Sequence, residues 1–363
     1  MSGVDALIRR LVATRTAPDA KLLPLLAPDW LAAWPERRAA ADAALMAAAR
    51  AERRRVYGDT VFLRGLIEFT NYCSNDCYYC GIRASNRAAV RYRLDEAAIL
   101  DAVETVVRAG LGTVVLQGGE DPLWTCDRLT ALVRQIRGCH PGLAITLSVG
   151  EHPAACYQAL RAAGADRYLL REESADPRHY SLLHPPRQQL ATRLGALADL
   201  RAAGFQVGGG FMVGSPGQGP GEVLADLRYL QQLRPEMIGI GPFLHHRETP
   251  FAAAPDGDLR LTLRLVALLR LLLPSALLPA TTALATASAA GRTAGLNAGA
   301  NVLMPNFTPV AVRADYSLYD NKSRADTIDA DLTEIRRQVE SAGCRIDFGR
   351  GDWRPAPEDS GVL

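Results

Sequence analysis

A regular alternation of short β-rich runs with amphipathic helical runs constrains the fold of this 363-residue chain more than any other feature. Runs of β-branched and apolar residues predict eight strands: Val61–Thr70, Thr113–Gln117, Ala144–Val149, Arg167–Arg171, Val207–Val213, Met237–Gly241, Pro279–Ala283 and Asn301–Met304. Helical patterns fill most of the intervals between them: Asp95–Ala109, Cys126–Arg137, Pro153–Ala163, Gln188–Ala203, Gly221–Leu233 and Asp258–Leu273. Eight strands alternating with helices over about 250 residues predict a (β/α)8 barrel of the α/β class. A doubly wound open sheet is the alternative, because periodicity does not show whether a sheet closes on itself.

The segments on either side of this pattern differ from it in composition. Residues 1–60 are rich in Ala, Leu and Arg, and prolines divide them, which predicts an N-terminal extension of short helices. Residues 61–345 hold the predicted barrel. Residues 346–363, with Pro355 and Pro357, predict a loosely ordered C-terminal tail. No low-complexity linker separates a second catalytic domain.

Charge and composition exclude some classes of partner. The formal net charge of +2 argues against a broad nucleic-acid or membrane surface, which needs clustered Lys and Arg. The richest apolar run, Leu259–Leu273, is interrupted by arginines and predicts a helix that covers the barrel rather than a membrane span. The N-terminus shows no signal-peptide pattern, and the odd count of seven cysteines does not suit a disulfide framework. We therefore expect a cytoplasmic protein in a reducing compartment.

Three cysteines follow directly after the first predicted strand, with the spacing C-x3-C-x2-C. Cys73, Cys77 and Cys80 lie where a barrel keeps its chemistry, on a loop at the carboxyl end of a strand. A 4Fe–4S cluster takes one protein ligand per iron, so three thiolates leave one iron open for a small molecule. This motif resembles that of radical S-adenosylmethionine (SAM) enzymes, in which the open iron binds SAM. The resemblance implies one 4Fe–4S cluster and SAM as cofactors.

Other interpretations of the cysteines are less well supported. A structural zinc ion needs four ligands, and no His or fourth Cys lies nearby in the sequence. Buried core cysteines would not need this spacing, or the polar residues between them. The remaining cysteines lie on helical patterns, where we expect free thiols that act as small apolar side chains: Cys126, Cys139, Cys156 and Cys344.

A Gly-Gly-Glu sequence ends the second predicted strand. Taken alone, Gly118, Gly119 and Glu120 fit an ordinary turn between a strand and a helix. After the cysteine motif, the same residues resemble the radical SAM segment that holds the amino group of SAM. The resemblance also implies that Tyr79 contacts the adenine.

Charged residues at the fourth predicted strand suggest further SAM contacts. Arg171 and Glu173 are placed to bind the SAM carboxylate and the ribose hydroxyls, or else to form a surface ion network. Arg193, on the following helix, is a second candidate for the carboxylate contact. A solvated helix face is the alternative for this arginine.

Several further segments, in chain order, resemble the HydE family of FeFe-hydrogenase maturases across about residues 50 to 345: Leu147–Glu151, Ala165–Arg171, Met212–Gln218, Ile238–Phe243, Pro279–Ala283 and Met304–Pro309. Biotin synthase and 3-methylornithine synthase belong to the same group. The cysteine motif is common to the whole superfamily, so it is the last two segments that distinguish the HydE family from biotin synthase and 3-methylornithine synthase.

This resemblance implies a closed barrel with SAM at its top and a substrate cavity in its interior. Thr281 and Thr282, on the seventh predicted strand, and Tyr316 and Tyr319, after the eighth, are then candidates to line that cavity. Without the resemblance, the two threonines indicate only a strand, because threonine favours β structure, and the two tyrosines indicate a half-buried packing pair.

Family membership further implies a place in hydrogenase cofactor assembly. The implied substrate is a cysteine-bound iron complex with carbonyl and cyanide, delivered from HydG, on whose sulfur the adenosyl radical acts. HydF and a ferredoxin- or flavodoxin-type electron donor are the other implied partners. Some relatives carry a second cluster near the C-terminus, but residues 318–332 hold no cysteine here, which predicts a single cluster. A radical SAM synthase of the methylornithine or biotin type and a metal-binding scaffold without SAM chemistry are the rival hypotheses.

Overall fold

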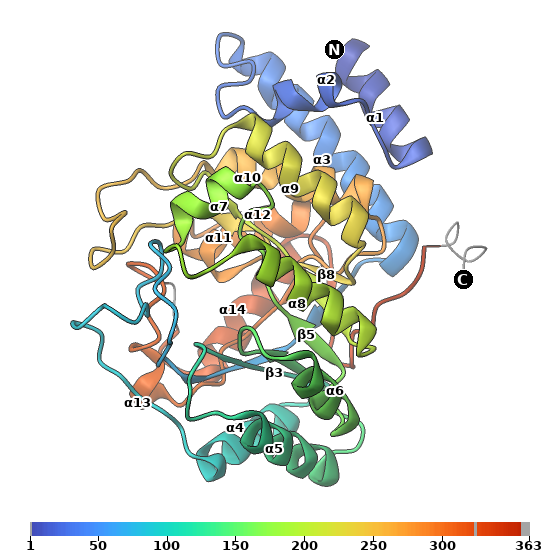
Figure 1. The fold of residues 1–363 in the computed structure, drawn as a ribbon. Coiled ribbons are helices and arrows are strands. Elements are labelled where there is room, and N and C mark those ends of the chain that lie inside the picture. The colour runs from blue at the N-terminus through green and yellow to red at the C-terminus, as the bar shows by residue number, and fades with distance from the viewer. Residues whose placement is uncertain (1, 323–324, 357–363) are drawn as a thin grey trace.

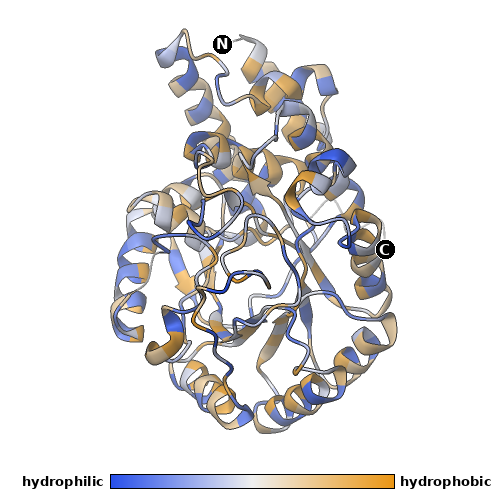
Figure 2. Ribbon diagram, turned by 60° about the vertical axis from the view of Figure 1, so that its left-hand side comes forward, coloured by the Kyte–Doolittle hydropathy of each residue, from blue (hydrophilic) through white to orange (hydrophobic). Residues whose placement is uncertain are grey.

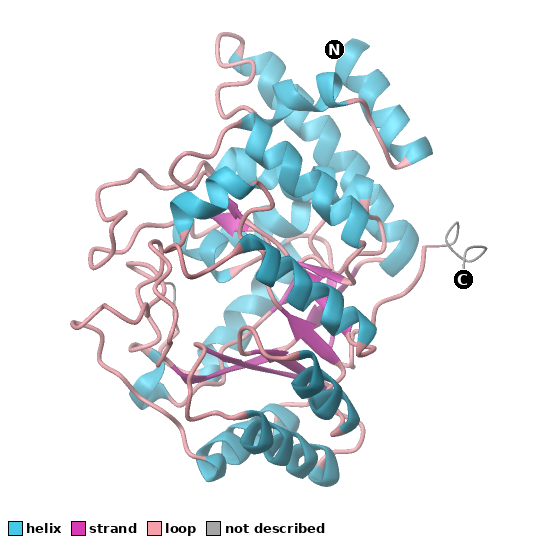
Figure 3. Cartoon of the chain, in the orientation of Figure 1, coloured by secondary structure: helices cyan, strands magenta, loops and turns pink. Residues whose placement is uncertain are grey.

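Parallel strands form the centre of the structure, a computed structural model that describes residues 2–322 and 325–356 (Figures 1 and 3). The strands in chain order are β1 (Thr60–Leu63), β2 (Gly65–Thr70), β3 (Thr113–Gly118), β4 (Ala144–Ser148), β5 (Arg167–Leu169), β6 (Gln206–Gly209), β7 (Met212–Val213), β8 (Met237–Ile238), β9 (Gly241–Pro242), β10 (Val302–Leu303) and β11 (Arg345–Asp347). One parallel sheet has the order β2-β3-β4-β5-β6-β8. β1 and β2 continue one another, with a break only at Arg64.

The strand pairings form a complete circuit. From β8, an isolated parallel bridge joins Met237 to Leu277, and a second joins Pro279 to Val302 of β10. β10 then pairs with β1, and Leu66 of β2 bridges to Asn306 beyond β10. An open sheet has no such return to its first strand. The predicted (β/α)8 fold class is confirmed.

Helices surround the ring of strands on its outside, as Figure 2 shows. They are α1 (Ser2–Thr14), α2 (Asp19–Leu22), the 3-10 helix η1 (Leu23–Leu26), α3 (Pro35–Tyr57), α4 (Glu96–Arg108), α5 (Cys126–Cys139), α6 (Ala154–Ala162), α7 (Pro177–Leu183), α8 (Leu190–Ala202), α9 (Pro220–Leu233), α10 (Leu259–Leu272), α11 (Thr282–Ala287), α12 (Gly291–Asn297), α13 (Val310–Arg313) and α14 (Ile328–Ser341). The core lies between these helices and the outward faces of the strands. Val114 and Leu116 of β3 point into it, so Val115 and Gln117 point into the barrel.

The N-terminal segment contains one long helix, contrary to the expectation of short helices only. Pro35 occupies the first turn of α3, where its missing N–H costs nothing, and no proline interrupts the following residues. α3 packs on α10 through a buried ion pair, in which Arg264 donates to Asp42 over 2.8 Å. In Figure 1, α1, α2 and α3 lie together at one side of the barrel.

The seventh strand was predicted over too long a segment. Residues 279–283 contribute a single bridge at Pro279, and α11 begins at Thr282. The Thr281 hydroxyl caps this helix by accepting from Leu284 N over 3.4 Å. Threonine favours both strands and helix N-caps, and here the cap prevails.

The C-terminal segment is better ordered than predicted, as far as residue 356; Pro357 and the residues after it lie outside the described part. β11 pairs with β1, and Asp352 forms an ion pair of 2.6 Å with Arg167, whose side chain is fully buried. Pro355 does not loosen the described segment, because buried polar groups at the barrel floor hold it. Within the described residues, we find no helix with the length and apolarity to cross a bilayer.

Candidate active site

The segment between β2 and α4 carries the three closely spaced cysteines. Cys73, Cys77 and Cys80 are free thiols that are partly exposed. We call residues 71–93 the cysteine loop. Backbone hydrogen bonds tie it to three other loops, from Ser74 N to Glu120 O (2.8 Å), from Tyr78 N to Leu183 O (2.9 Å) and from Gly81 N to Leu318 O (2.8 Å). The thiols are therefore held in place from several sides of the barrel mouth.

Arg91 braces the cysteine loop from within. Its guanidinium donates to the carbonyls of Asn71 (2.5 Å), Ile82 (2.8 Å) and Arg83 (2.6 Å). A planar group with five donors can bind several carbonyls at once and so fix a loop that has no regular structure of its own.

The three thiols are half-buried and close enough to interact electrostatically. Burial raises the pKa of Cys73 to about 11. Burial also raises the pKa of Cys80 well above its ordinary value, and the neighbouring thiolates of Cys77 and Cys73 raise it further. Three thiolates together are therefore unfavourable unless a positive centre binds them. A coordinating metal keeps thiols deprotonated, so this donor set fits an iron–sulfur cluster.

The arrangement does not suit a single metal ion. Over the part of the chain that the structure describes, no group of three His, Cys, Asp or Glu side chains is placed to hold one metal ion. A structural zinc ion would need four such ligands around one point.

Glycines allow the loops of the site to pack closely. A Cβ atom on Gly119 would lie 2.2 Å from Tyr72 O and 2.7 Å from Cys73 Cβ. On Gly118 it would lie 2.8 Å from Thr70 Cγ2. The absence of side chains on these glycines thus allows the end of β2 and the cysteine loop to approach them closely. Side chains at these positions would displace the loop.

An ion network lies beside the glycines and joins three strands. Arg193 donates to Glu151 over 2.5 Å and lies 3.9 Å from Glu120. Burial opposes the charge of Arg193, but the carboxylates of Glu151 and Glu120 outweigh it and raise its pKa. Arg193 also donates to the carbonyl of Arg171 over 2.9 Å. The alternative of a solvated helix face is wrong for this arginine, since it is 9% exposed.

The end of β5 places Arg171 and Glu173 at the same mouth. Their charged groups lie 3.0 Å apart, and Glu173 has a left-handed backbone with φ of +62°. Among the described residues, the buried atoms here that make no hydrogen bond include Arg171 Nε and the Tyr180 hydroxyl, and also Arg171 Nη2 and Glu173 Oε2, which meet each other as an ion pair. Native proteins rarely leave such atoms unpaired. A ligand with an ammonium, a carboxylate and ribose hydroxyls offers the missing partners, so these residues fit SAM.

Tyr79 points away from the open part of this mouth. Its hydroxyl lies 3.3 Å from His184 Nε2. The His184 Nδ1 atom lies 2.9 Å from the carbonyl of Tyr180 and donates to it. His184 Nε2 therefore accepts from Tyr79, so only the ring and backbone of Tyr79 are left to contact a ligand.

A buried charged pair lies farther inside the barrel. Glu68 of β2 is 1% exposed and forms an ion pair with Lys322. Asn306 donates to the same carboxylate over 2.9 Å. The structure places Tyr316 next to this pair, with its ring 4.8 Å from Lys322 Nζ and its hydroxyl 3.4 Å from Gln117.

The other predicted cavity residues lie beside α11. Thr282 lines a 230 Å³ pocket with Met304, Asn306 and Arg292. Burial raises the pKa of Tyr319, and a side-chain hydrogen bond with Thr286 offsets part of this rise. Thr281 is occupied as the helix cap. The four predicted residues therefore fall into two places, Tyr316 near Glu68 and the others near α11.

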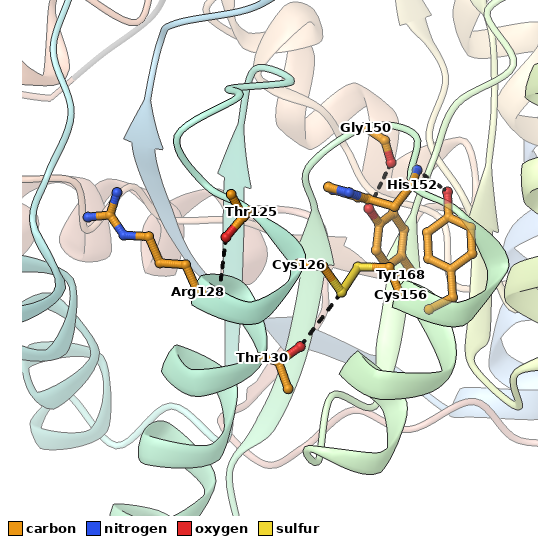
Figure 4. The surroundings of a disulfide bond; sticks show 9 residues. Thr125, Cys126, Arg128, Thr130, Gly150, His152, Cys156 and Tyr168 are labelled. Atoms are coloured by element: carbon orange, nitrogen blue, oxygen red, sulfur yellow. Dashed lines mark hydrogen bonds between the residues drawn. A yellow bond between two sulfur atoms is a disulfide. The ribbon is translucent and has the colours of Figure 1, made fainter.

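Cys126 and Cys156 form a disulfide bond, which corrects the expectation of free thiols (Figure 4). Cys126 begins α5 and Cys156 lies in the first turn of α6, and these neighbouring helices bring the two Cα atoms to 5.7 Å. The sequence separation of 30 residues gives no sign of this, because the contact depends on how two βα units pack.

Sequence reasoning assigned no role to three polar residues of the site. Glu151 forms the shortest contact of Arg193, Lys322 neutralises Glu68, and Gln188 contacts Cys77. Glu151 follows closely after a predicted strand, as Glu120 does, and that position was a usable signal. Gln188 and Lys322 come from segments without a motif.

Known proteins share both the sequence and the fold. The family model of the Radical SAM superfamily matches residues 67–230. The [FeFe] hydrogenase maturase subunit HydE of Thermotoga maritima is 43% identical over 270 residues, which cover 74% of this chain and 77% of that protein.

Two solved structures agree with this. A methylornithine synthase (PylB) superimposes with a TM-score of 0.79 over 98% of this chain and 100% of its own, at 26% identity. The maturase HydG from Carboxydothermus hydrogenoformans gives a TM-score of 0.74 over 96% and 80% of the chains at 20% identity, a likeness of fold alone. With its barrel, its three free thiols and its identity to HydE, the chain belongs to the HydE family of radical SAM enzymes.

Proposed function

We propose that this protein is a maturase of the HydE type, which helps to build the FeFe-hydrogenase cofactor. The observation that carries the proposal is the 43% identity to HydE across about three quarters of both chains. Fold likeness alone would not suffice, because one barrel hosts many reactions.

Enzymes of this family use a 4Fe–4S cluster and SAM. We assign Cys73, Cys77 and Cys80 as cluster ligands, which the crowded, half-buried thiols support. When bound, the reduced cluster gives one electron to SAM and yields a 5′-deoxyadenosyl radical.

The chain's own residues bind and orient SAM. Glu120 is half-buried beside Gly119 and receives the ammonium group. Arg193 carries a charge that Glu151 fixes in position, and it binds the carboxylate. Arg171 and Glu173 form an ion pair with each other and have buried polar atoms without a hydrogen bond, which bind the carboxylate and the ribose. Tyr79 borders the adenine through its ring and backbone.

The substrate lies deeper in the barrel than SAM. Buried polar groups favour a polar or thiolate-bearing molecule there, and a cysteine-bound iron complex with carbonyl and cyanide has this character. Tyr316 contacts it beside Glu68, and Thr281, Thr282 and Tyr319 line the α11 side. By the family resemblance, the sulfur of this substrate would be the atom on which a 5′-deoxyadenosyl radical acts.

HydG supplies this substrate and HydF receives the product in the proposed assembly. Electrons come from a ferredoxin- or flavodoxin-type protein in the cytoplasm. The basic outer face of the cysteine loop, with exposed Arg87 and the adjacent exposed Arg187, supports an acidic donor.

The disulfide bond Cys126–Cys156 is of a kind that is uncommon in the cytoplasm.

The second candidate function is methylornithine synthesis. The superposition on PylB over 98% of the chain favours it. Incubation of the reduced enzyme with SAM and lysine, or with dethiobiotin, separates the candidates, since turnover of either compound would replace the proposal.

The direct test is hydrogenase maturation. In this test, a hydrogenase, HydF, HydG and this protein are produced together in a host that has no hydrogenase maturases of its own. We expect active hydrogenase only when this protein is present, and none with Cys77→Ala. Reduced protein that forms no 5′-deoxyadenosine from SAM would instead identify a metal-binding scaffold.

A further inference from the structure

The segment between α7 and α8 lies directly against the cysteine loop. His184 meets the Tyr79 hydroxyl at 3.3 Å, and Arg187 donates to the Ser74 carbonyl over 2.6 Å. Residues 184–189 therefore hold the loop that carries the three thiols. The same segment leads into α8, which carries Arg193.

Gln188 contacts one of those thiols with its side-chain amide. Its Nε2 atom lies 3.3 Å from Cys77 Sγ, and its Oε1 atom lies 3.4 Å from the backbone N of Asp76. Oε1 also lies 3.7 Å from the same sulfur, a contact in which a protonated thiol would donate. A backbone N–H can only donate, so Asp76 holds Oε1 and directs Nε2 to the sulfur. A thiolate that ligates iron has no proton, so Cys77 Sγ can only accept a hydrogen bond, and Gln188 Nε2 donates it.

We propose that Gln188 raises the reduction potential of the cluster through this N–H···S hydrogen bond to Cys77. The inference rests on the proposed function, in which Cys77 is a cluster ligand. The step concerned is the transfer of one electron from the donor protein to the oxidised cluster, with no bond formed or broken and no proton moved. Reduction adds negative charge that is shared with the sulfur ligands. A donor at 3.3 Å stabilises the reduced state more than the oxidised state.

The position of Gln188 strengthens this effect. The amide is half-buried, and its oxygen is held by the backbone N–H of Asp76, so water screens the contact with sulfur less than it would at an exposed site. Gln188 is thus a positioning residue for electron transfer, which acts through Cys77.

Gln189 provides a matched control. It is the next residue, it is exposed, and its amide donates to the carbonyl of Pro186 over 2.5 Å instead of to sulfur. Gln189→Leu makes the same chemical change without removing a donor to the cluster.

The test is an EPR-monitored redox titration of the anaerobically reconstituted full chain, as wild type, Gln188→Leu, Gln188→Glu and Gln189→Leu. We expect both Gln188 variants to hold wild-type iron and to titrate at a more negative midpoint. At a fixed potential the ratio of reduced to oxidised cluster should fall about three- to tenfold, and a tenfold fall is 59 mV for one electron. Gln189→Leu should match wild type.

The other outcomes are also decisive. A wild-type midpoint in an iron-loaded Gln188 variant would overturn the inference. If Gln188→Leu loses iron, Gln188→Glu decides, because it keeps the length of the side chain and an oxygen for Asp76 N–H. Loss of the cluster in both, with Gln189→Leu intact, would show a structural requirement and overturn the tuning role. If wild type itself forms no cluster whose EPR spectrum changes with SAM, the proposed function fails instead.

Discussion

Arg193 on α8 donates a 2.5 Å hydrogen bond to Glu151, which follows β4, across 42 positions of sequence. The arginine that we assign to the SAM carboxylate is thereby fixed by a carboxylate from a neighbouring strand. Glu120 lies 3.9 Å from the same guanidinium, so one buried cation serves two acids. Removal of either acid changes the charge and the position of the arginine together.

Glu151→Gln should therefore weaken SAM binding without abolishing the cluster. A charged hydrogen bond is worth about 1.5–3 kcal/mol, so we expect SAM to bind roughly tenfold more weakly or worse. Equilibrium binding of SAM to reconstituted protein measures this, with Glu104→Gln on α4 as control. Unchanged affinity would remove Glu151 from the site.

Cys77→Ala should remove the cluster and leave the barrel folded. Cys77 does not belong to the core cluster between strands and helices, so we expect the secondary structure not to depend on this thiol. Iron content should fall and the far-UV circular dichroism should match wild type. Cys139→Ala, an exposed free thiol, is the control. A full and active cluster in Cys77→Ala would contradict the ligand assignment.

Local signals predicted the site better than distant ones. Cys73, Cys77 and Cys80 lie within one loop, so their spacing alone indicated a cluster. The Gly-Gly-Glu segment alone fitted an ordinary turn, and only the cysteine motif before it suggested a role. Arg193 with Glu151, Lys322 with Glu68, and Cys126 with Cys156 are contacts between separate βα units, which no local pattern encodes. Thr281 shows the remaining difficulty, because one residue type suits both a strand and a helix cap.

Glu172 should make the protein less stable as the pH rises. Burial raises its folded pKa to about 7 from 4.5, and one oxygen accepts from Gly210 N over 2.8 Å. Between these values the folded state binds more protons than the unfolded state, so the free energy of unfolding falls with rising pH. The contribution of Glu172 to the free energy of unfolding is fully present below pH 4.5 and is lost as the pH rises through about 7, a difference of up to about 3 kcal/mol.

Glu172→Gln should remove this loss, because an amide keeps the acceptor for Gly210 and carries no charge. We expect a variant more stable than wild type at pH 8 in urea unfolding, with Glu340→Gln, an exposed residue of α14, unchanged. Equal stability of wild type and Glu172→Gln at pH 8 would show that Glu172 ionises without cost.

The Cys126–Cys156 bond should stabilise the fold. It closes a loop with a sequence separation of 30 residues, for which loop-closure entropy gives about 3–4 kcal/mol. Urea unfolding of the cluster-free protein, with and without reductant, measures the difference. Cys126→Ser should match the reduced wild type and be insensitive to reductant. The same midpoint in all samples would mean that the bond does not form in solution.

Reversal of charge at the outer face of the cysteine loop should slow electron delivery. Arg187 is exposed and tied to the Ser74 carbonyl, and Arg87 is exposed on the loop itself. Charge at the rim of an interface acts mainly on the association rate and is screened over about 10 Å at 0.1 M salt. Arg187→Glu and Arg87→Glu should each slow reduction by an acidic flavodoxin severalfold at low salt, and the difference from wild type should shrink as salt is added. Arg10→Glu on α1, at the far side of the molecule in Figure 1, should have no effect, and dithionite should reduce every variant equally. Equal slowing by Arg10→Glu would show that net charge, and not this face, governs the encounter.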